Sequence, residues 1–355
     1  MHIRHHRVQL SSATWLAAAI VAMVTLTSLT AAAQTDPTWT APRTADGQPD
    51  LQGVWDFRTL TPLQRPQDRA NQAVLTDEEV AEIEAAAAQR TAEADAPSEV
   101  RTEPLEAGGD VGAYNNFWFD RGAGVVGDQR TSLIVDPPNG RLPDLVAGVS
   151  AQGPPDDQAP SDRPVRFRVG GLGLQGPEDR GLAERCLLGF NTGPPITPGG
   201  YNQNLQVFQT PGYVAILNEM VHDARIVPLD GRPYLPEDFT QWMGNSRGYW
   251  EGDTLVVETR NFSDQTSSFS PSVVSAVGTG ANMVLIERFR RLDEDTLHYE
   301  YTVNDPSTFE RPFTVVLPMQ RSDSQLYEYA CHEGNYGLYN MLAGQRIDEL
   351  RSSAP

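Results

Sequence analysis

Alternating apolar and polar positions run through the second half of the chain, from Asn204 onward. Pro-Gly, Asp-Gly, Glu-Gly-Asp and Asp-Glu-Asp turns separate the runs, which read NLQVFQT, PGYVAILNE, VHDARIVPL, GDTLVVETRNF, NMVLIERFRRL, DTLHYEYTVND, RPFTVVLPMQ and QLYEYACH. A period of two indicates a strand with one buried face, and short turns join antiparallel neighbours. This half of the chain therefore predicts an antiparallel meander of eight or nine strands.

A meander of this length must pair or cover its edge strands, and closure into a barrel is the simplest solution. An earlier predicted strand, within LQGVWDFRTL, carries Gly53-Val54-Trp55. This Gly-x-Trp resembles the motif in the first strand of lipocalin-like (calycin) barrels, in which the Trp plugs one end of the barrel. We predict a mainly β fold, a calycin-like barrel, with a β-sandwich or split sheets as the alternative.

One long helix is predicted ahead of the meander, in LTDEEVAEIEAAAAQRTAEADA. Thr76 is suited to cap its N-terminus, and residues 77–79 form an acidic first turn. Its apolar stripe is thin, so we expect a surface helix. The predicted organisation is one β-rich domain over residues 34–355, with a flexible loop at 149–163, where Pro, Asp and Gly are concentrated.

The first 33 residues have the pattern of a secretory signal peptide. A basic stretch precedes the apolar run from Trp15 to Leu29, and small residues at 31–33 suit a signal peptidase. The run is shorter than the roughly 20 apolar residues that cross a bilayer, so no membrane span is predicted. The expected location is the periplasm or the medium, and an uncleaved N-terminal anchor is the alternative.

The basic residues are all arginine, and the formal net charge is −20 at pH 7. Without lysine the chain can form no Schiff base and has no lysine general base. A strongly negative field repels nucleic acid and anionic lipid. The expected partner is therefore a small-molecule ligand and not a nucleic acid, and the composition leaves the oligomeric state open.

The chain has two cysteines, Cys186 and Cys331. In an exported protein they face an oxidising compartment, so we predict a disulfide between them. A thiolate nucleophile at Cys331 is then disfavoured. Because Cys331 and His332 are adjacent on a predicted strand, they point to opposite faces and cannot form a Cys–His dyad with each other.

Three short motifs match known patterns but lack the required context. The glycine run at 171–176 matches G-x-G-x-x-G, but no βαβ unit surrounds it. Tyr336 stands where H-E-x-x-H needs its second histidine. Residues 244–248 match G-x-S-x-G, but they lead into a predicted strand instead of a helix. We assign none of these chemistries.

His222 and His332 are the candidate acid and base, with Glu333 beside them. On a strand His222 would share an apolar face with Ile226, and the inward face of a barrel lines its cavity. Histidine titrates near neutral pH, which suits proton transfer. One alternative is a metal held by both histidines and a carboxylate such as Glu328. The other alternative is structural: His222 would be a hydrogen-bonded histidine of the core without a chemical role. We predict no organic cofactor and assign no metal.

Arginine and aromatic side chains are the candidate ligand contacts. They suit a sugar or an aromatic ligand, and a turn-rich connection pinned by tryptophans is the structural alternative for the glycine-punctuated loop at 241–253. The candidates are Arg225, Trp242, Arg247, Tyr327 and Tyr329.

The chain contains several long, distinctive strings: HDARIVPLDGRP, WEGDTLVVET and YEYACHEGNY, with LQGVWDFRTLTPLQRP and RTSLIVDPPNGRLP. In these strings it resembles a widespread family of exported bacterial proteins of unassigned function. The resemblance implies one exported domain and no particular chemistry. The predicted function is binding of a small apolar or aromatic molecule, with acid/base conversion as hydro-lyase, isomerase or hydrolase. The alternatives are a non-catalytic carrier and a structural or partner-binding envelope protein.

Overall fold

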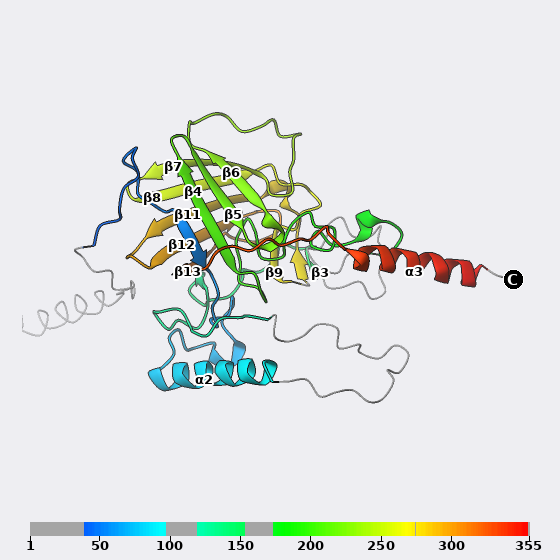
Figure 1. Ribbon diagram of the computed structural model, residues 1–355, viewed down its shortest axis with the longest axis horizontal. Helices are drawn as coiled ribbons and strands as arrows, with labels where there is room; N and C mark the ends of the chain where they lie inside the picture. The colour runs from blue at the N-terminus through cyan, green and yellow to red at the C-terminus, as the bar shows by residue number, and fades with distance from the viewer. Residues whose placement is uncertain (1–38, 97–118, 153–172, 274, 354–355) are drawn as a thin grey trace, which may run out of the picture. The chain divides into compact units, whose positions relative to one another are not determined.

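A ten-stranded antiparallel sheet is the largest element of the structure, a computed structural model that describes residues 39–96, 119–152, 173–273 and 275–353 (Figure 1). The described residues belong to one compact unit, Asp36–Pro355. The elements in chain order are β1 (Gly53–Asp56), η1 (Gln67–Arg69), α2 (Asp77–Ala94), β2 (Ile134–Asp136), β3 (Ala151–Gln152), η4 (Pro177–Asp179), β4 (Asn204–Thr210), β5 (Tyr213–Asn218), η5 (Met220–His222), β6 (Ala224–Pro228), β7 (Asn245–Glu251), β8 (Thr254–Arg260), β9 (Phe269–Ser272), β10 (Ser275–Val277), η6 (Gly280–Asn282), β11 (Val284–Arg291), β12 (Thr296–Asn304), β13 (Phe313–Ser322) and α3 (Tyr336–Ser352).

The large sheet follows the predicted meander closely. Its strand order is β6-β5-β4-β1-β13-β12-β11-β8-β7, with β2 paired to β13 beside this path. The first described strand, β1, lies between β4 and the last one, β13. The first and last strands in the sequence are therefore neighbours in the sheet. A small second sheet has the order β3-β10-β9. The mainly β, antiparallel prediction is confirmed.

The two end strands of the large sheet, β6 and β7, lie side by side. Gly248 of β7 allows this approach: an added Cβ would lie 2.7 Å from Leu229 Cδ2 and 2.8 Å from Val227 Cγ1. No hydrogen-bonded ladder joins β6 to β7 among the described residues. The sheet is therefore curled so that its ends touch, and a closed calycin barrel is not shown.

Alternate positions of the large sheet are buried, as the period of two predicts. In β12 the buried residues are Leu297, Tyr299, Tyr301 and Val303, and the side chains between them are partly exposed. Buried side chains from nine strands of the large sheet, and from β9 and β10 of the small sheet, pack into one cluster. Its largest members, Trp55, Tyr299 and several phenylalanines, are almost completely removed from water. The inward face of the sheet is a packed core.

The predicted surface helix is present as α2. Thr76 caps it: the Glu79 backbone N–H donates to Thr76 Oγ1 at 3.3 Å, and the Thr76 backbone N–H donates to Glu79 Oε2 at 2.8 Å. This reciprocal pair satisfies two backbone donors at the start of the helix. Ala87 is the one fully buried residue of the helix, so the expectation of a surface helix is confirmed.

The C-terminal part of the chain differs from the prediction. QLYEYACH, Gln325–His332, was predicted as a strand, but it joins no ladder and forms an extended tail. A second long helix, α3, follows it, where one long helix had been expected in the whole chain. No residue of α3 is buried, and its apolar stripe is too weak to have indicated a helix.

Two predictions fall partly or wholly outside the described residues. The expected signal peptide, residues 1–33, lies outside them. Of the expected loop at 149–163, residues 151–152 form β3, which pairs with β10, and residues 153–163 lie outside. Within the described part of the chain, no helix has the length and apolar character needed to cross a membrane.

Candidate functional site

A disulfide fixes the C-terminal tail to the middle of the chain. Cys186 and Cys331 are bonded, with their Cα atoms 5.7 Å apart, as the sequence predicted. The Asn335 side-chain amide adds a hydrogen bond of 2.8 Å to the Glu184 backbone oxygen. Cys331 therefore does not act as a thiol nucleophile, and its bond brings Tyr329, two residues earlier, against the body of the protein.

A pocket of about 740 Å³, here called the loop pocket, opens beside this disulfide. Connecting segments and β9 form it, and the inward face of the large sheet contributes little. Its lining comes from five stretches: residues 59–63 after β1, residues 119–121, residues 183–201, residues 220–221 in η5, and residues 270–273, with Leu133 and Tyr329 completing it. The cavity is therefore separate from the packed interior where the barrel comparison had placed it.

Aromatic rings dominate one wall of this pocket. Tyr201 contacts Phe119 with ring centroids 6.0 Å apart and Phe190 with centroids 5.2 Å apart, both edge to face. Edge-to-face pairs are a favoured aromatic geometry, so the three rings hold one another in place. Tyr329 and Met220 extend this apolar surface.

Two side chains of the charged residue types line the same pocket among the described residues, Arg121 and Glu184. The Arg121 guanidinium lies over the Phe119 ring, 4.9 Å from its centroid. The Glu184 carboxylate forms an ion pair of 2.8 Å with Arg180, which is almost completely buried. The neighbouring acid, Asp120, is paired with Arg58. The lining thus combines apolar rings with one exposed cation and one neutralised carboxylate.

The backbone beside the pocket adopts unusual conformations. Cys186, Val221 and His222 have φ values of +56°, +58° and +46°. This left-handed region is rare for residues other than glycine, and rarest for a β-branched residue such as Val221. Asp223 stabilises the arrangement by accepting hydrogen bonds from the Gly189 backbone N–H at 2.9 Å and the Thr192 hydroxyl at 3.0 Å. Such strained backbone clusters at functional sites.

A second pocket of about 580 Å³ adjoins the first and shares four residues with it. Glu328 and Glu333 line this second pocket, together with the tail around Cys331. The shared residues are Ala183, Glu184, Tyr201 and Tyr329. The tail therefore forms a wall between a mainly aromatic pocket and an acidic one.

The predicted catalytic residues lie around the tail and not on a strand face. His222 is exposed in η5, and its Nδ1 lies 3.1 Å from the Tyr329 backbone oxygen. His332 is exposed in the turn before α3, and Glu333 lines the second pocket. Neither histidine lines the aromatic pocket. The prediction of an apolar, inward face for His222 is wrong, because Ile226 is 57% exposed.

Arg225 lies in the core and not at a ligand surface. Its guanidinium forms a bidentate ion pair with Glu287, with 2.9 Å between Nη2 and Oε1. The Tyr299 hydroxyl donates to Glu287 Oε1 at 2.7 Å and accepts from the Ile196 backbone N–H at 3.0 Å. The network links β6, β11 and β12 across the buried face. Sequence reasoning missed Glu287, although it occupies an inward position of an alternating run.

Burial and pairing set the pKa values in this network. Burial alone lowers the pKa of Arg225, but the Glu287 carboxylate offsets this and the pKa is raised. Burial and the Glu287 charge raise the pKa of Tyr299 well above its usual value. At neutral pH the guanidinium is therefore charged and the phenol protonated, so the network is a fixed, fully paired set of hydrogen bonds.

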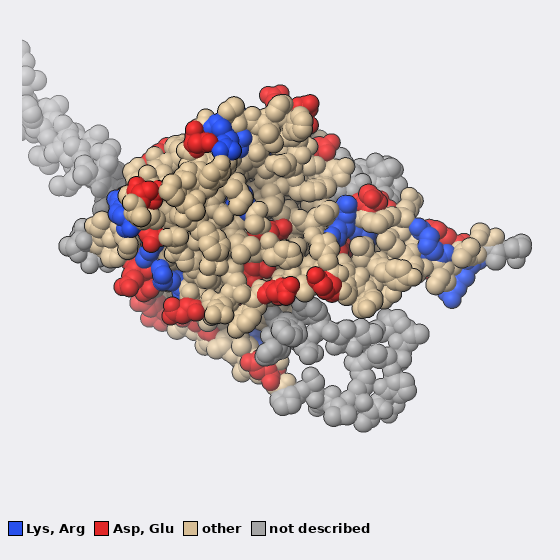
Figure 2. Space-filling model, turned by 45° about the horizontal axis from the view of Figure 1, so that its top comes forward, with Lys and Arg blue, Asp and Glu red and all other residues tan. Residues whose placement is uncertain are grey.

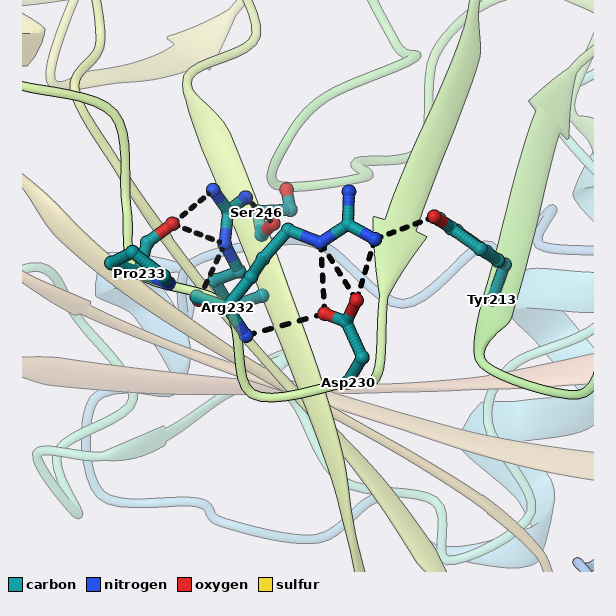
Figure 3. Close-up of polar contacts among 6 residues, drawn as sticks. Tyr213, Asp230, Arg232, Pro233 and Ser246 are labelled. Carbon is teal, nitrogen blue, oxygen red and sulfur yellow. Dashed lines mark hydrogen bonds and ion pairs between the residues drawn. The ribbon is translucent and has the colours of Figure 1, made fainter.

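Arg247 also proves to be a structural contact, next to the Arg232–Asp230 ion pair and the Tyr213 hydroxyl that Figure 3 shows. It lies in β7, where a loop had been expected, and donates to the backbone oxygens of Pro233 at 2.6 Å and Ser246 at 2.7 Å. Its guanidinium also lies 5.2 Å from the Tyr234 ring centroid. Beside it Arg232 pairs with Asp230 and donates to the Tyr213 hydroxyl at 2.5 Å. These bonds fix the connection between β6 and β7.

The remaining predicted ligand contacts separate into two groups. Tyr329 lines both pockets, whereas Tyr327 is 76% exposed and Trp242 lies away from either pocket. Phe119, Phe190, Tyr201 and Arg121 were not predicted. They come from irregular connections, where no periodicity indicates which way a side chain points.

The described residues contain no group of three or more His, Cys, Asp or Glu side chains that could hold a metal ion. Comparisons with protein-family models, with curated proteins and with solved structures found no match to the chain.

Proposed function

We propose that the protein binds a small aromatic or largely apolar molecule in the pocket beside the disulfide. The observation that carries this proposal is the convergence of Phe119, Phe190, Tyr201 and Tyr329 on one cavity of about 740 Å³. Small-molecule sites typically measure about 300–1,000 Å³ and have apolar, aromatic walls with a few polar groups. This pocket has that size and that composition.

The position of the pocket supports a site outside the sheet interior. The inward face of the large sheet is filled by buried side chains, including Trp55, Tyr299 and Phe289. A ligand there would have to displace a close-packed core, which is costly. The loop pocket needs no such displacement, and the disulfide holds Tyr329 in its wall.

Binding can be tested with N-phenyl-1-naphthylamine, a neutral aromatic probe whose fluorescence rises in apolar surroundings. We expect saturable binding to the mature chain and a Kd about tenfold higher for Tyr201→Ala, which removes the central ring of the wall. Tyr249→Ala is the matched control, because Tyr249 is an exposed tyrosine of β7 away from the pocket. Circular dichroism would verify that both variants fold. Equal affinities for the two variants, or no saturable binding, would refute the proposal.

Acid/base conversion of the bound molecule is the second candidate function. Its support is the contact of His222 with the Tyr329 backbone oxygen and the position of Glu333 in the adjoining pocket. Chromatography coupled to mass analysis of the probe or ligand after incubation would detect a change of mass or, from the retention time, a change of isomer. Loss of that change in His222→Ala or His332→Ala, with binding retained, would assign the chemistry. An unchanged ligand with the unmodified protein would leave a carrier.

We propose further that the protein is exported and that its sheet is a calycin-like barrel. The disulfide supports an oxidising compartment. The buried Trp55 supports the barrel: its indole N–H donates to the Leu51 oxygen at 2.9 Å, and Arg321 of the last strand lies 5.7 Å from its ring centroid. The adjacent end strands β6 and β7 are consistent with closure. Mass measurement of the protein from its own host would reveal cleavage near residue 33.

A further inference from the structure

The pocket contains a cation in a chain that is strongly acidic. The formal net charge is −20, and the arginines that the structure describes are mostly engaged with carboxylates or backbone oxygens. Figure 2 shows one face of the molecule, on which basic side chains lie beside acidic ones in several places and further acidic side chains stand apart. Among the described residues that line the two pockets, an arginine without a carboxylate partner is therefore unusual.

Arg121 is such an arginine among the described residues. Its contact is the face of the Phe119 ring, 4.9 Å from guanidinium carbon to ring centroid. The nearest acid in sequence, Asp120, is occupied by Arg58 and by the Gly122 backbone N–H at 3.1 Å. No ion pair joins Arg121 to a carboxylate in the part of the chain that the structure describes. Its N–H donors are thus available at the pocket.

The other charge at the pocket does not compete for an anion. Glu184 is held by the buried Arg180 through hydrogen bonds of 3.0 Å from Nη2 to Oε1 and an ion pair of 2.8 Å to Oε2. The pair contributes little net field, so Arg121 carries the unpaired charge among the described residues that line this pocket, and Glu328 and Glu333 line the adjoining one. A guanidinium stacked on a ring keeps its N–H edge free, and that edge matches the two oxygens of a carboxylate.

We propose that the ligand is an aromatic carboxylate, with its ring among Phe119, Phe190 and Tyr201 and its carboxylate on Arg121. This inference rests on the proposed function and adds the charge of the ligand to it. Ring burial supplies most of the affinity, and the charge-assisted hydrogen bonds supply the preference for an acid over a neutral ligand. A carboxylate that loses its water here gains Arg121 as a fixed partner of opposite charge. A neutral amide of the same shape has no charge to pair with Arg121.

The test compares 2-naphthoate with 2-naphthamide, which share a ring system and differ in charge. Titration calorimetry at pH 7 on the full mature chain should show the acid binding about tenfold to a hundredfold more tightly, as hydrogen bonds to charged groups allow. Arg121→Gln should abolish this preference and change the affinity for the amide much less than the affinity for the acid. Arg311→Gln, which removes an exposed arginine paired with Asp136 away from the pocket, should preserve the preference.

The outcomes separate the two proposals. Equal binding of acid and amide to the unmodified protein would overturn the carboxylate inference and leave the aromatic pocket standing. A preference that persists in Arg121→Gln would also overturn it, because another group would then hold the anion. No binding of either compound would overturn both proposals.

Discussion

The packed interior of the large sheet and the loop pocket place arginine in opposite surroundings. In the interior, Arg225 is almost completely buried and its guanidinium is matched by the two oxygens of Glu287. At the pocket, Arg121 is exposed and lies on a ring face, with no carboxylate among the described residues. A fully paired buried charge is part of the fold, whereas an exposed cation in an aromatic cavity is free to select a ligand.

The backbone shows the same contrast. The interior is built on regular antiparallel ladders, and in β12 buried residues alternate with partly exposed ones. The pocket is built on connections with left-handed residues at Cys186, Val221 and His222, held by a disulfide and by Asp223. Regular pairing gives stability, and the irregular segments supply most of the pocket lining.

Removing the disulfide should have the largest effect on this contrast. Cys186 and Cys331 are 145 residues apart, and the chain-entropy model values such a closure at roughly 4–5 kcal/mol. The Cys186→Ala/Cys331→Ala variant should unfold at lower urea concentration and should also bind the neutral probe more weakly, because Tyr329 loses its anchor. Unchanged probe affinity in a destabilised but folded variant would show that the tail is not part of the site.

Breaking the buried ion pair should destabilise the fold and spare the site. Glu287→Gln leaves the Arg225 charge buried without a partner, which costs about 3–5 kcal/mol. Probe affinity, measured where the variant is folded, should be unchanged, since neither residue lines a pocket. Glu251→Gln at the exposed pair with Arg288 is the control and should leave the urea midpoint unchanged. Similar losses for both variants would contradict a special role for the buried pair.

Crowding the contact between the end strands should have an intermediate effect. Gly248→Ala places a Cβ less than 3 Å from Val227 and Leu229, and overpacking of this kind costs about 1–3 kcal/mol. Gly127→Ala is the control, because an added Cβ there meets nothing within 4 Å. If both glycines tolerate alanine equally in urea unfolding, β6 and β7 do not pack as closely as described.

The smallest effect is expected from acid at the loop between β6 and β7. Hydrogen bonds from Arg232 lower the pKa of Asp230 from 3.8 to about 2. A depressed pKa in the folded state contributes stability above the unfolded value, and this contribution is lost as pH falls from about 4 towards 2. Between pH 6 and pH 2.5, Asp230→Asn should therefore lose slightly less stability than the unmodified protein. An identical pH dependence would exclude the contribution of this pair.

Much of the sheet could be predicted from sequence, because alternation of apolar residues determines which face is buried. Leu297, Tyr299 and Tyr301 illustrate this in β12. The face of β6 was assigned wrongly because the strand begins only at Ala224, after the turn of η5. A shift of one residue moves every side chain to the opposite face, so Arg225 became buried and Ile226 exposed.

The candidate site was only partly predictable. Cys186–Cys331 followed from the compartment and from there being two cysteines, and Tyr329 came with it. Phe119, Phe190 and Tyr201 lie in irregular segments, where contacts between distant residues determine side-chain directions and no local period reports them. The run around Tyr327 alternates like a strand but finds no neighbouring strand, and propensity alone does not form a ladder.

The most direct test of the central claim is a crystal structure of the mature chain soaked with N-phenyl-1-naphthylamine. We predict ligand density between Phe119, Tyr201 and Tyr329, with the side chains around Trp55 and Tyr299 still packed against one another. Density within the interior of the large sheet, or none at a probe concentration that saturates binding in solution, would contradict the loop pocket as the site.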